Sequence, residues 1–331
     1  MHMQQNTLNE WLKNIMPTQT IELAPIEGDA SLRRYFRLNN DLGSYIVMDA
    51  SSEKSSLIPF TNVGNLLSTN GVHAPKIHAV DYQKGFALLD DFGNQLLLNA
   101  LTVETVDALY KGAIDMLIKI QQCPIQDTTM QLFDATYMQT ECALFYDWFL
   151  ERYLQINLSN ADLASLHRTI GSIIEEVAKQ PTVLIHRDYH SRNLMLVNEN
   201  PQKIGVIDFQ DAMVGPITYD LVSLLKDCYI SWPRDRILNW IGYYYQTIPT
   251  PFTGGMDTFV RAFDLCGVQR HLKVLGIFSR LHIRDQKSMY LQHLPRILQY
   301  LEETLARYED LKPLVLFIQN SINPKIKLKN S

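Results

Sequence analysis

The chain has 331 residues, 46% of them hydrophobic and 20% charged, and its formal net charge is −5 at pH 7. This length allows two domains or one two-lobed unit, and the composition is that of an ordinary globular protein. A net negative charge gives no general electrostatic reason to bind nucleic acid or an anionic membrane. Neither is therefore an expected partner, although a local basic groove for one small anionic ligand stays open.

The compartment is predicted from the N-terminus and the cysteines. The opening residues, MHMQQNTLNEW, lack the basic start and the apolar stretch of a signal peptide. No apolar run approaches the roughly 18 residues that a membrane span needs. Free buried thiols are favoured over disulfides or a zinc site, because the cysteines are widely spaced and form no C-x-x-C pair. They are Cys123, Cys142, Cys228 and Cys266. We therefore expect a cytoplasmic protein.

Strand signals dominate the first 90 residues. The predicted strands are residues 33–38, 44–50, 76–81 and 85–90, and the predicted helix is 57–71. The first two strands flank turn residues that end in Gly43, which is a hairpin pattern. The helix ends at Asn70-Gly71, a common C-terminal signal. These elements predict a small β-rich lobe with one helix across it.

Helical spacing takes over after a connector near residues 90–95. Helices are predicted at 102–120, at 161–178 and again from about residue 218, and short apolar strands at 182–185, 194–197 and 204–207. We therefore predict an α+β fold of two lobes. Residues 1–91 would form a small lobe with an antiparallel sheet, and residues 92–331 a large, mostly helical lobe.

The polar residues that carry chemistry follow these short strands. His186 and Asp188 come directly after the first strand, Asn193 precedes the second, and Asp208 follows the third. Strand ends are where a rigid scaffold presents reactive side chains. The order H-x-D-x-x-x-x-N followed by D-F is that of the kinase catalytic loop, although Gln210 stands where protein kinases have glycine.

Phosphoryl transfer explains why these residue types occur in this order. One carboxylate must orient the attacking hydroxyl and accept its proton, which we assign to Asp188. A second carboxylate and a side-chain carbonyl can hold Mg²⁺, a hard cation that prefers oxygen ligands, and we assign these roles to Asp208 and Asn193. His186 would hydrogen-bond locally and shape the loop. The alternative is that both aspartates are loop acids with capping roles.

The chain resembles the aminoglycoside phosphotransferase and choline kinase superfamily, whose members are protein-kinase-like, over about residues 20–310. More closely, it resembles the anomeric amino-sugar kinases of bacterial cell-wall recycling, the N-acetylmuramate/N-acetylglucosamine kinases. The segments that carry this closer resemblance are GDASLRRYFRL (28–38), YIVMDA (45–50), HRDYHSRNLM (186–195), DFQDAMVGPITYDLVSLLKD (208–227) and GVQRHLKVLGIFSRLHIRD (267–285).

The resemblance implies a bilobal, protein-kinase-like fold with ATP bound in the cleft and Mg²⁺ as the cofactor. It further implies transfer of the γ-phosphoryl group to the C1 hydroxyl of N-acetylmuramate or N-acetylglucosamine in peptidoglycan recycling. A sugar-1-phosphate uridylyltransferase would then use the product. We expect a monomer or a weak dimer.

The nucleotide site departs from the protein-kinase pattern. Met48 stands where the third strand of a protein kinase carries a lysine for the phosphates. Arg33 is the favoured replacement cation, and Ser31 lies in a turn that resembles a phosphate-covering loop. The connector would present backbone groups to adenine. Its candidate residues are Leu89, Asp90 and Phe92.

The acceptor site is less well defined by sequence. Tyr189 and His190 lie in the catalytic loop, and Asp211 lies three residues beyond Asp208. Arg270 interrupts an apolar helical pattern and would meet either an acidic group of the substrate or an internal carboxylate. Asp220 matches an acid that supports the catalytic loop in the superfamily, so a structural role is predicted for it.

The sequence therefore predicts an ATP- and Mg²⁺-dependent small-molecule kinase acting on an amino sugar. Two alternatives stay open. One is a kinase for another hydroxylated acceptor, of the aminoglycoside, choline or homoserine type. The other is a non-catalytic nucleotide-binding protein, which the residue Met48 favours and the intact set Asp188, Asn193 and Asp208 opposes.

Overall fold

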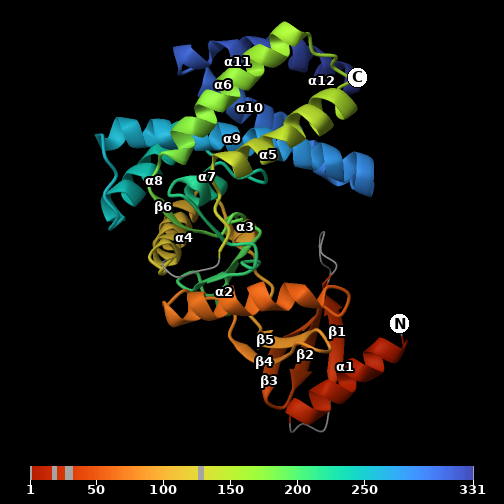
Figure 1. Cartoon of the computed structure of the whole chain (residues 1–331). Helices are drawn as coiled ribbons and strands as arrows, with labels where there is room; N and C mark the ends of the chain where they lie inside the picture. The colour runs from red at the N-terminus through yellow and green to blue at the C-terminus, as the bar shows by residue number, and fades with distance from the viewer. Residues whose placement is uncertain (1, 17–20, 27–32, 126–129, 331) are drawn as a thin grey trace. The chain divides into compact units, whose positions relative to one another are not determined.

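The computed structural model describes residues 2–16, 21–26, 33–125 and 130–330 (Figure 1). The chain forms two compact units, of which the first contains residues 1–123 and 192–212 and the second contains residues 124–191 and 213–331. The segment 192–212 thus belongs to the first unit, although the residues on either side of it in sequence belong to the second. The predicted lobe boundary after residue 91 stays a prediction.

The first unit contains a five-stranded antiparallel sheet with the strand order β1-β2-β3-β5-β4. Its strands are β1 (Glu22–Ile26), β2 (Arg34–Asn40), β3 (Gly43–Asp49), β4 (Ile77–Asp81) and β5 (Phe86–Asp90). Both predicted strand pairs are confirmed within a residue or two. Gly85 is needed at the turn before β5, because its φ is +86° and a Cβ would lie 2.8 Å from the Cα of Ser51.

One helix that the sequence pattern did not predict packs against the three central strands of the sheet, β2, β3 and β5. Helix α1 (His2–Ile15) is followed by Met16, and the apolar side chains of this segment pack on the sheet. The cluster consists of Leu8, Trp11, Leu12, Met16, Leu38, Val47, Phe86 and Leu88. Alternate residues of each strand face it, as the two-residue period of a strand requires.

The rest of the first unit is helical apart from one small ladder. The elements are η1 (Lys54–Ser56), α2 (Leu57–Thr69), α3 (Leu97–Ala100), α4 (Val106–Gln121), β7 (Leu194–Leu196), η3 (Val197–Glu199) and β8 (Ile204–Val206). Strands β7 and β8 pair antiparallel, with Leu194 opposite Val206. Helix α2 confirms the predicted helix at 57–71, and α4 confirms most of the one at 102–120.

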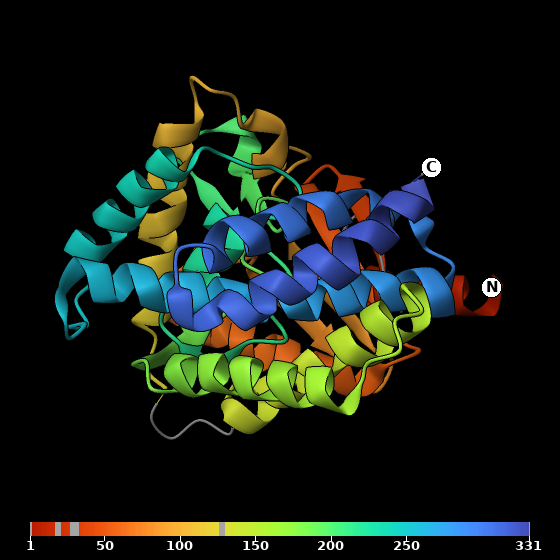
Figure 2. The ribbon, with the colours of Figure 1, turned by 90° about the horizontal axis from the view of Figure 1, so that it is seen from above.

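The second unit is built along one long helix, α9 (Gly255–Asp285). Helices α5, α6, α7 and α10 all pack against it, and Figures 1 and 2 show α9 running through the helical part of the chain. The helical elements are α5 (Ala135–Leu144), η2 (Phe145–Tyr153), α6 (Asn160–Ala178), α7 (Tyr219–Leu225), α8 (Arg234–Thr247), η4 (Ser288–His293), α10 (Leu294–Leu305), η5 (Glu309–Leu311), α11 (Lys312–Phe317), η6 (Ile318–Ile322) and α12 (Asn323–Asn330).

The second unit also holds a two-stranded ladder of β6 (Thr182–Ile185) and β9 (Met213–Pro216), paired antiparallel from Thr182–Pro216 to Ile185–Met213. The sequence predicted β6 but not β9. Neither ladder contains a cysteine. All four cysteines are free and buried, as predicted. Within the described residues, no helix is both long and apolar enough to cross a membrane.

Candidate active site

The loop after β6, residues 186–191, carries the predicted catalytic aspartate and belongs to the second unit. Arg187 has a φ of +74°, a left-handed conformation that is uncommon for a residue with a side chain. Both peptide groups around it are held. The carboxylate of Asp220 accepts hydrogen bonds from the backbone N–H of His186 at 2.6 Å and of Arg187 at 3.0 Å. The Arg187 carbonyl accepts one from Nη1 of Arg270 at 3.0 Å.

Further bonds fix the rest of the loop. The N–H of Asp188 donates to Nδ1 of His186 at 3.3 Å, and the carbonyl of Asp188 accepts from the N–H of His190 at 3.0 Å. The backbone N–H and the hydroxyl of Ser191 both donate to Asp227, at 3.0 and 2.5 Å. A strained backbone persists where the surroundings over-determine it, so the loop presents the Asp188 carboxylate from a rigid frame.

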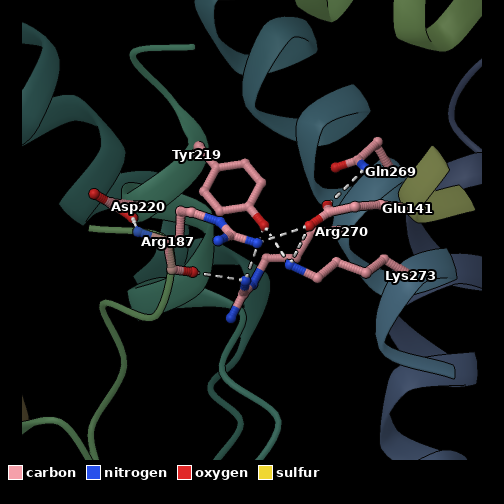
Figure 3. A network of polar contacts seen from close by, with 7 residues as sticks. All are labelled: Glu141, Arg187, Tyr219, Asp220, Gln269, Arg270 and Lys273. Atoms are coloured by element: carbon pink, nitrogen blue, oxygen red, sulfur yellow. Dashed lines mark hydrogen bonds and ion pairs between the residues drawn. The ribbon is translucent and has the colours of Figure 1, made fainter. Parts of the chain in front are cut away.

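Buried charges surround this loop (Figure 3). Glu141 of α5 forms ion pairs with Nζ of Lys273 at 2.9 Å and with Nη2 of Arg187 at 3.1 Å. The hydroxyl of Tyr219 lies 3.1 Å from Nζ of Lys273 and 3.3 Å from Nη1 of Arg270. Figure 3 shows the loop, α5, α7 and α9 each directing a polar group toward this network.

These charges set the protonation of two acids in opposite directions. Burial would raise the pKa of Asp188, but the positive charges of Lys273 and Arg270 outweigh it and lower the pKa to about 2. Burial raises the pKa of Asp220 to about 6, even though the nearby His186 and two backbone N–H groups oppose that rise. Asp188 is therefore a carboxylate at neutral pH, as an acceptor of hydroxyl protons must be.

The predicted metal ligands lie together in the first unit. Asn193 directly precedes β7, and Asp208 is the second residue after β8, so the antiparallel ladder brings both to the same end. The N–H of Ile207 donates to the Asn193 carbonyl at 3.0 Å, which ties the two segments. Nδ2 of Asn193 lies 3.4 Å from Oδ2 of Asp208. Asp208 is exposed and has a left-handed φ of +65°.

This pair fits Mg²⁺ by its chemistry. An asparagine carbonyl and a carboxylate are both oxygen ligands, and a half-turn of the Asn193 amide would aim its oxygen at the same point. Mg²⁺ usually keeps several waters and takes only one or two carboxylates plus substrate phosphates. Among the described residues no group of three or more His, Cys, Asp or Glu side chains could hold a metal alone.

The residues after Asp208 anchor it to the sheet unit. Phe209 is buried and stacks on Phe60 of α2, with ring centroids 5.0 Å apart. The same ring lies 3.2 Å from where a Cβ at Gly64 would be, so this glycine allows the ring to approach α2. Nε2 of Gln210 donates to Oδ1 of Asp208 at 2.8 Å and approaches Oδ2 of Asp211 at 3.4 Å. Asp211 is exposed, and its predicted contact with the acceptor stays a prediction.

The predicted phosphate-binding residues are only partly described. Ser31 lies outside the described residues. Nε of Arg33 donates to the Ser56 hydroxyl at 3.2 Å. Burial raises the pKa of Tyr35, and the neighbouring Arg33 guanidinium opposes that rise. Met48 is fully buried opposite Tyr35 and contributes no charge.

The connector after β5 is held by side chains at several points. Leu89 is buried in β5, and Phe92 is buried against Met195 and Val197 of the β7–β8 region. Oδ1 of Asp90 lies 2.7 Å from Nε2 of His78. Contacts of the nucleotide base with this connector stay a prediction for Leu89, Asp90 and Phe92.

The predicted acceptor residues of the catalytic loop have described roles in packing. Tyr189 is fully buried, with its ring 5.8 Å from that of His186. The ring of His190 lies 5.4 Å from Tyr229 in an edge-to-face arrangement. Arg270 is 4% exposed and donates to Arg187 and Tyr219, so its described contacts are internal. Acceptor contacts for these residues stay predictions.

Sequence reasoning missed several residues that hold the site. Glu141, Asp227 and Lys273 were not singled out. Each is a charged residue within or at the edge of an apolar stretch: Glu141 begins ECALF, Asp227 follows Lys226 in LLKDC, and Lys273 lies within HLKVLG. Buried polar side chains need partners, so a charge within such a run is the signal that would have found them.

Known proteins resemble this chain both in sequence and in fold. The model of the phosphotransferase enzyme family matches residues 22–253. A protein named N-acetylmuramate/N-acetylglucosamine kinase from Pseudomonas putida is 41% identical over 295 residues, which cover 88% of this chain and 86% of that protein. A protein of the same name from Pseudomonas aeruginosa is 40% identical over 320 residues, 93% of this chain and 94% of that protein.

Solved structures confirm the predicted two-lobed, kinase-like α+β fold. The ADP-bound aminoglycoside phosphotransferase APH(2'')-Ib matches with a TM-score of 0.62, covering 90% of this chain and 98% of that chain at 17% identity. At this identity the likeness concerns the fold alone. The family match and the two relatives go further, and they show that the chain belongs to the phosphotransferase enzyme family, with N-acetylmuramate/N-acetylglucosamine kinases among its relatives.

Proposed function

We propose that this protein is an ATP- and Mg²⁺-dependent kinase that phosphorylates the anomeric C1 hydroxyl of N-acetylmuramate and N-acetylglucosamine. The observation that carries the proposal is the ionised Asp188, which a rigid loop holds at the end of a strand. A relative that matches most of this chain bears the name of these sugar kinases. The same chain keeps Asn193 and Asp208 together at the end of a second ladder.

Asp188 would act on the acceptor hydroxyl. A carboxylate with a pKa of about 2 is a weak base, so it would first orient the hydroxyl by accepting its hydrogen bond. As the sugar oxygen bonds to the γ-phosphorus, the bond from that phosphorus to the β–γ bridging oxygen breaks and ADP leaves. The hydroxyl proton then passes to Asp188. An anomeric hydroxyl is more acidic than an ordinary alcohol, which suits a weak base.

Asn193 and Asp208 would hold Mg²⁺ against the nucleotide, and the bound cation would neutralise charge on the phosphates. Arg33 is the cation that we assign to the phosphates in place of a lysine at Met48, together with the loop that contains Ser31. Main-chain groups of the connector would bind adenine. The product, a sugar 1-phosphate, is a substrate for a uridylyltransferase, and we place the enzyme as a cytoplasmic monomer or weak dimer in peptidoglycan recycling.

Phosphorus NMR tests this assignment directly. The full chain is incubated with ATP, Mg²⁺ and either N-acetylmuramate or N-acetylglucosamine, and the product phosphate is examined for coupling to the anomeric proton. We expect a C1 phosphate with both sugars and none with the Asp188→Asn variant. A panel containing an aminoglycoside, choline and homoserine is run in parallel. Turnover of one of these without the sugars would overturn the acceptor assignment, and ATP binding without any turnover would overturn the catalytic one.

A further inference from the structure

Six charged side chains form one cluster around the catalytic loop. Glu141, Arg187, Asp188, Asp220, Arg270 and Lys273 are here called the loop charge cluster. Three of them are positive and three are negative. Asp227, which Ser191 of the same loop contacts, adds a further buried negative charge, so the ionised Asp188 balances the local charges of Lys273 and Arg270 and not those of the whole loop. An unbalanced charge in such a buried place is costly.

The two cations on α9, Arg270 and Lys273, are connected to the loop that carries Asp188 by contacts within the protein. Arg270 and Lys273 are 4% and 6% exposed, so neither offers its charge to solvent. They are three residues apart and lie on one face of the helix, where both reach the Tyr219 hydroxyl. Arg270 also holds the carbonyl of the residue before Asp188. Lys273 reaches the loop through Glu141, which it shares with the Arg187 guanidinium.

The left-handed backbone of Arg187 explains why the loop needs the contacts with Asp220, Arg270 and Glu141. Its φ of +74° is costly for a residue with a side chain, and a glycine would adopt it freely. An arginine at this position can form an ion pair with Glu141, at 3.1 Å, and this ion pair ties the loop to α5 through its side chain. Asp220 and Arg270 fix the peptide groups on either side.

We propose that Arg270 and Lys273 are positioning residues for the catalytic carboxylate, and that Asp188 in return is their counter-ion. The cations would hold the loop and keep its aspartate charged without touching the acceptor. The loop would lose order when Asp188 is neutralised. This inference rests on the proposed role of Asp188, and it replaces the predicted contact of Arg270 with substrate by an internal role.

A double-mutant cycle on the unliganded protein tests the coupling without any turnover. Apparent Tm is measured for wild type, Asp188→Asn, Lys273→Met and the double variant. We expect each single variant to lose roughly 4–10 °C. Because Lys273→Met removes the excess positive charge that Asp188→Asn creates, the double variant should lose at least about 3 °C less than the sum. Additive losses would overturn the proposal.

Two further double-mutant cycles check whether the coupling to Asp188 has the sign expected from charge, and whether it is confined to the loop charge cluster. Glu141→Gln raises the positive excess, so it should make Asp188→Asn more harmful than it is in wild type. Arg261, also on α9, pairs with Glu176 and Asp310 at the surface. Arg261→Met should therefore combine additively with Asp188→Asn. A compensating effect of Arg261→Met would point to net charge alone and overturn the proposal. If Lys273→Met does not fold, Lys273→Gln completes the same cycle.

Kinetics separate positioning from substrate contact. Lys273→Met should lower kcat at least about tenfold, while KM for ATP stays within about twofold, because only the alignment of Asp188 is lost. Lys273→Arg, which keeps the charge, should recover part of that loss. A raised KM for the acceptor with unchanged kcat would overturn the proposal. If wild type phosphorylates no sugar, the proposed function fails, and the stability cycle still decides the coupling.

Discussion

Gly276 of α9 lies directly against the backbone of Leu144 at the end of α5, so close that a Cβ on Gly276 would collide with the Leu144 carbonyl group. Lys273 precedes this glycine by three residues, and Glu141 precedes Leu144 by three. The close approach of the two helices therefore lies one turn away from the ion pair at 2.9 Å between these side chains. Packing at the glycine sets the spacing on which the loop charge cluster depends.

The variant Gly276→Ala should consequently be destabilising. The methyl group meets backbone, which cannot move aside as a flexible side chain can, and such overpacking costs roughly 1–3 kcal/mol. Urea unfolding measures this loss. The matched control is Gly171→Ala in α6, where an added Cβ meets nothing within 4 Å. There the change should stabilise by about 0.5–1 kcal/mol, as expected for alanine over glycine in a helix. Equal effects at the two sites would contradict the packing argument.

Two conservative substitutions test the roles assigned to the acids. Asp188→Asn should lower kcat by about 10²–10⁴-fold, because the hydroxyl loses the group that takes its proton. Asp208→Asn should cause a loss of similar size by weakening the hold on Mg²⁺, and more Mg²⁺ should restore part of it. Steady-state rates measured over a Mg²⁺ titration distinguish the loss of the proton acceptor in Asp188→Asn from the weakened Mg²⁺ binding in Asp208→Asn. Rescue of Asp188→Asn by Mg²⁺, or near-normal turnover by either variant, would contradict the assignment.

Local patterns in the sequence predicted much of the fold. The hairpin β2–β3 follows from two apolar runs around turn residues, and β6 from a short apolar run of four residues. Strand β9 was missed because Met213–Pro216 contains a glycine and a proline, which a pattern treats as breaks. It forms because its partner β6 supplies the hydrogen bonds. Such pairing is a tertiary effect that a local pattern does not contain.

The residues of the candidate site also fall into two groups, those that local sequence predicts and those that only tertiary packing brings together. Asp188, Asn193 and Asp208 were assigned from a spacing, because catalytic chemistry restricts residue type at fixed short intervals. Glu141 and Lys273 meet only through the crossing of α5 and α9, so no spacing connects them. Arg270 was noticed as a charge in an apolar helix, but its partner, the carbonyl of Arg187, is a backbone group that leaves no trace in sequence.

The connector after β5 offers a third test, on nucleotide affinity. Arg37 of β2 donates to Asp91 through Nε at 2.6 Å and Nη2 at 3.1 Å, and also to the carbonyl of Gly93 at 2.9 Å. This fork fixes the backbone that is proposed to bind adenine. A lysine cannot reproduce a bidentate contact, so Arg37→Lys should raise KM for ATP by about tenfold, equivalent to roughly one lost hydrogen bond to a charged group.

The control for this variant lies on the same strand. Nη2 of Arg34 forms an ion pair of 2.5 Å with Asp49, which a lysine can retain, so Arg34→Lys should leave KM for ATP close to wild type. Initial rates at saturating acceptor give both values, and kcat should change little in either variant. An unchanged KM in Arg37→Lys would show that the fork does not position the nucleotide.

Acid should destabilise the protein through His271 of α9. This ring is buried, stacks on Tyr300 with centroids 5.2 Å apart, and its Nε2–H donates to the carbonyl of Lys226 at 3.2 Å. Burial, and then the charges of Lys226 and Arg270, lower its pKa from 6.5 to about 3. Between these values the unfolded chain binds a proton that the folded chain does not. The contribution of His271 to the free energy of unfolding should therefore be largest above pH 6.5 and fall by up to about 1.4 kcal/mol per pH unit as the pH drops toward 3.

Urea unfolding at pH 7.0, 6.0 and 5.0 measures this slope in wild type and in His271→Gln, which keeps a donor for the Lys226 carbonyl but cannot titrate. The variant should be less stable at pH 7.0 because packing on Tyr300 is lost, and its stability should fall less steeply with acid. His282→Gln, on the same helix at a site where the ring contacts the Ser288 hydroxyl, serves as the control and should keep the wild-type slope. If His271→Gln retains the full slope, the acid sensitivity comes from other groups, and the neutral buried state assigned to His271 is wrong.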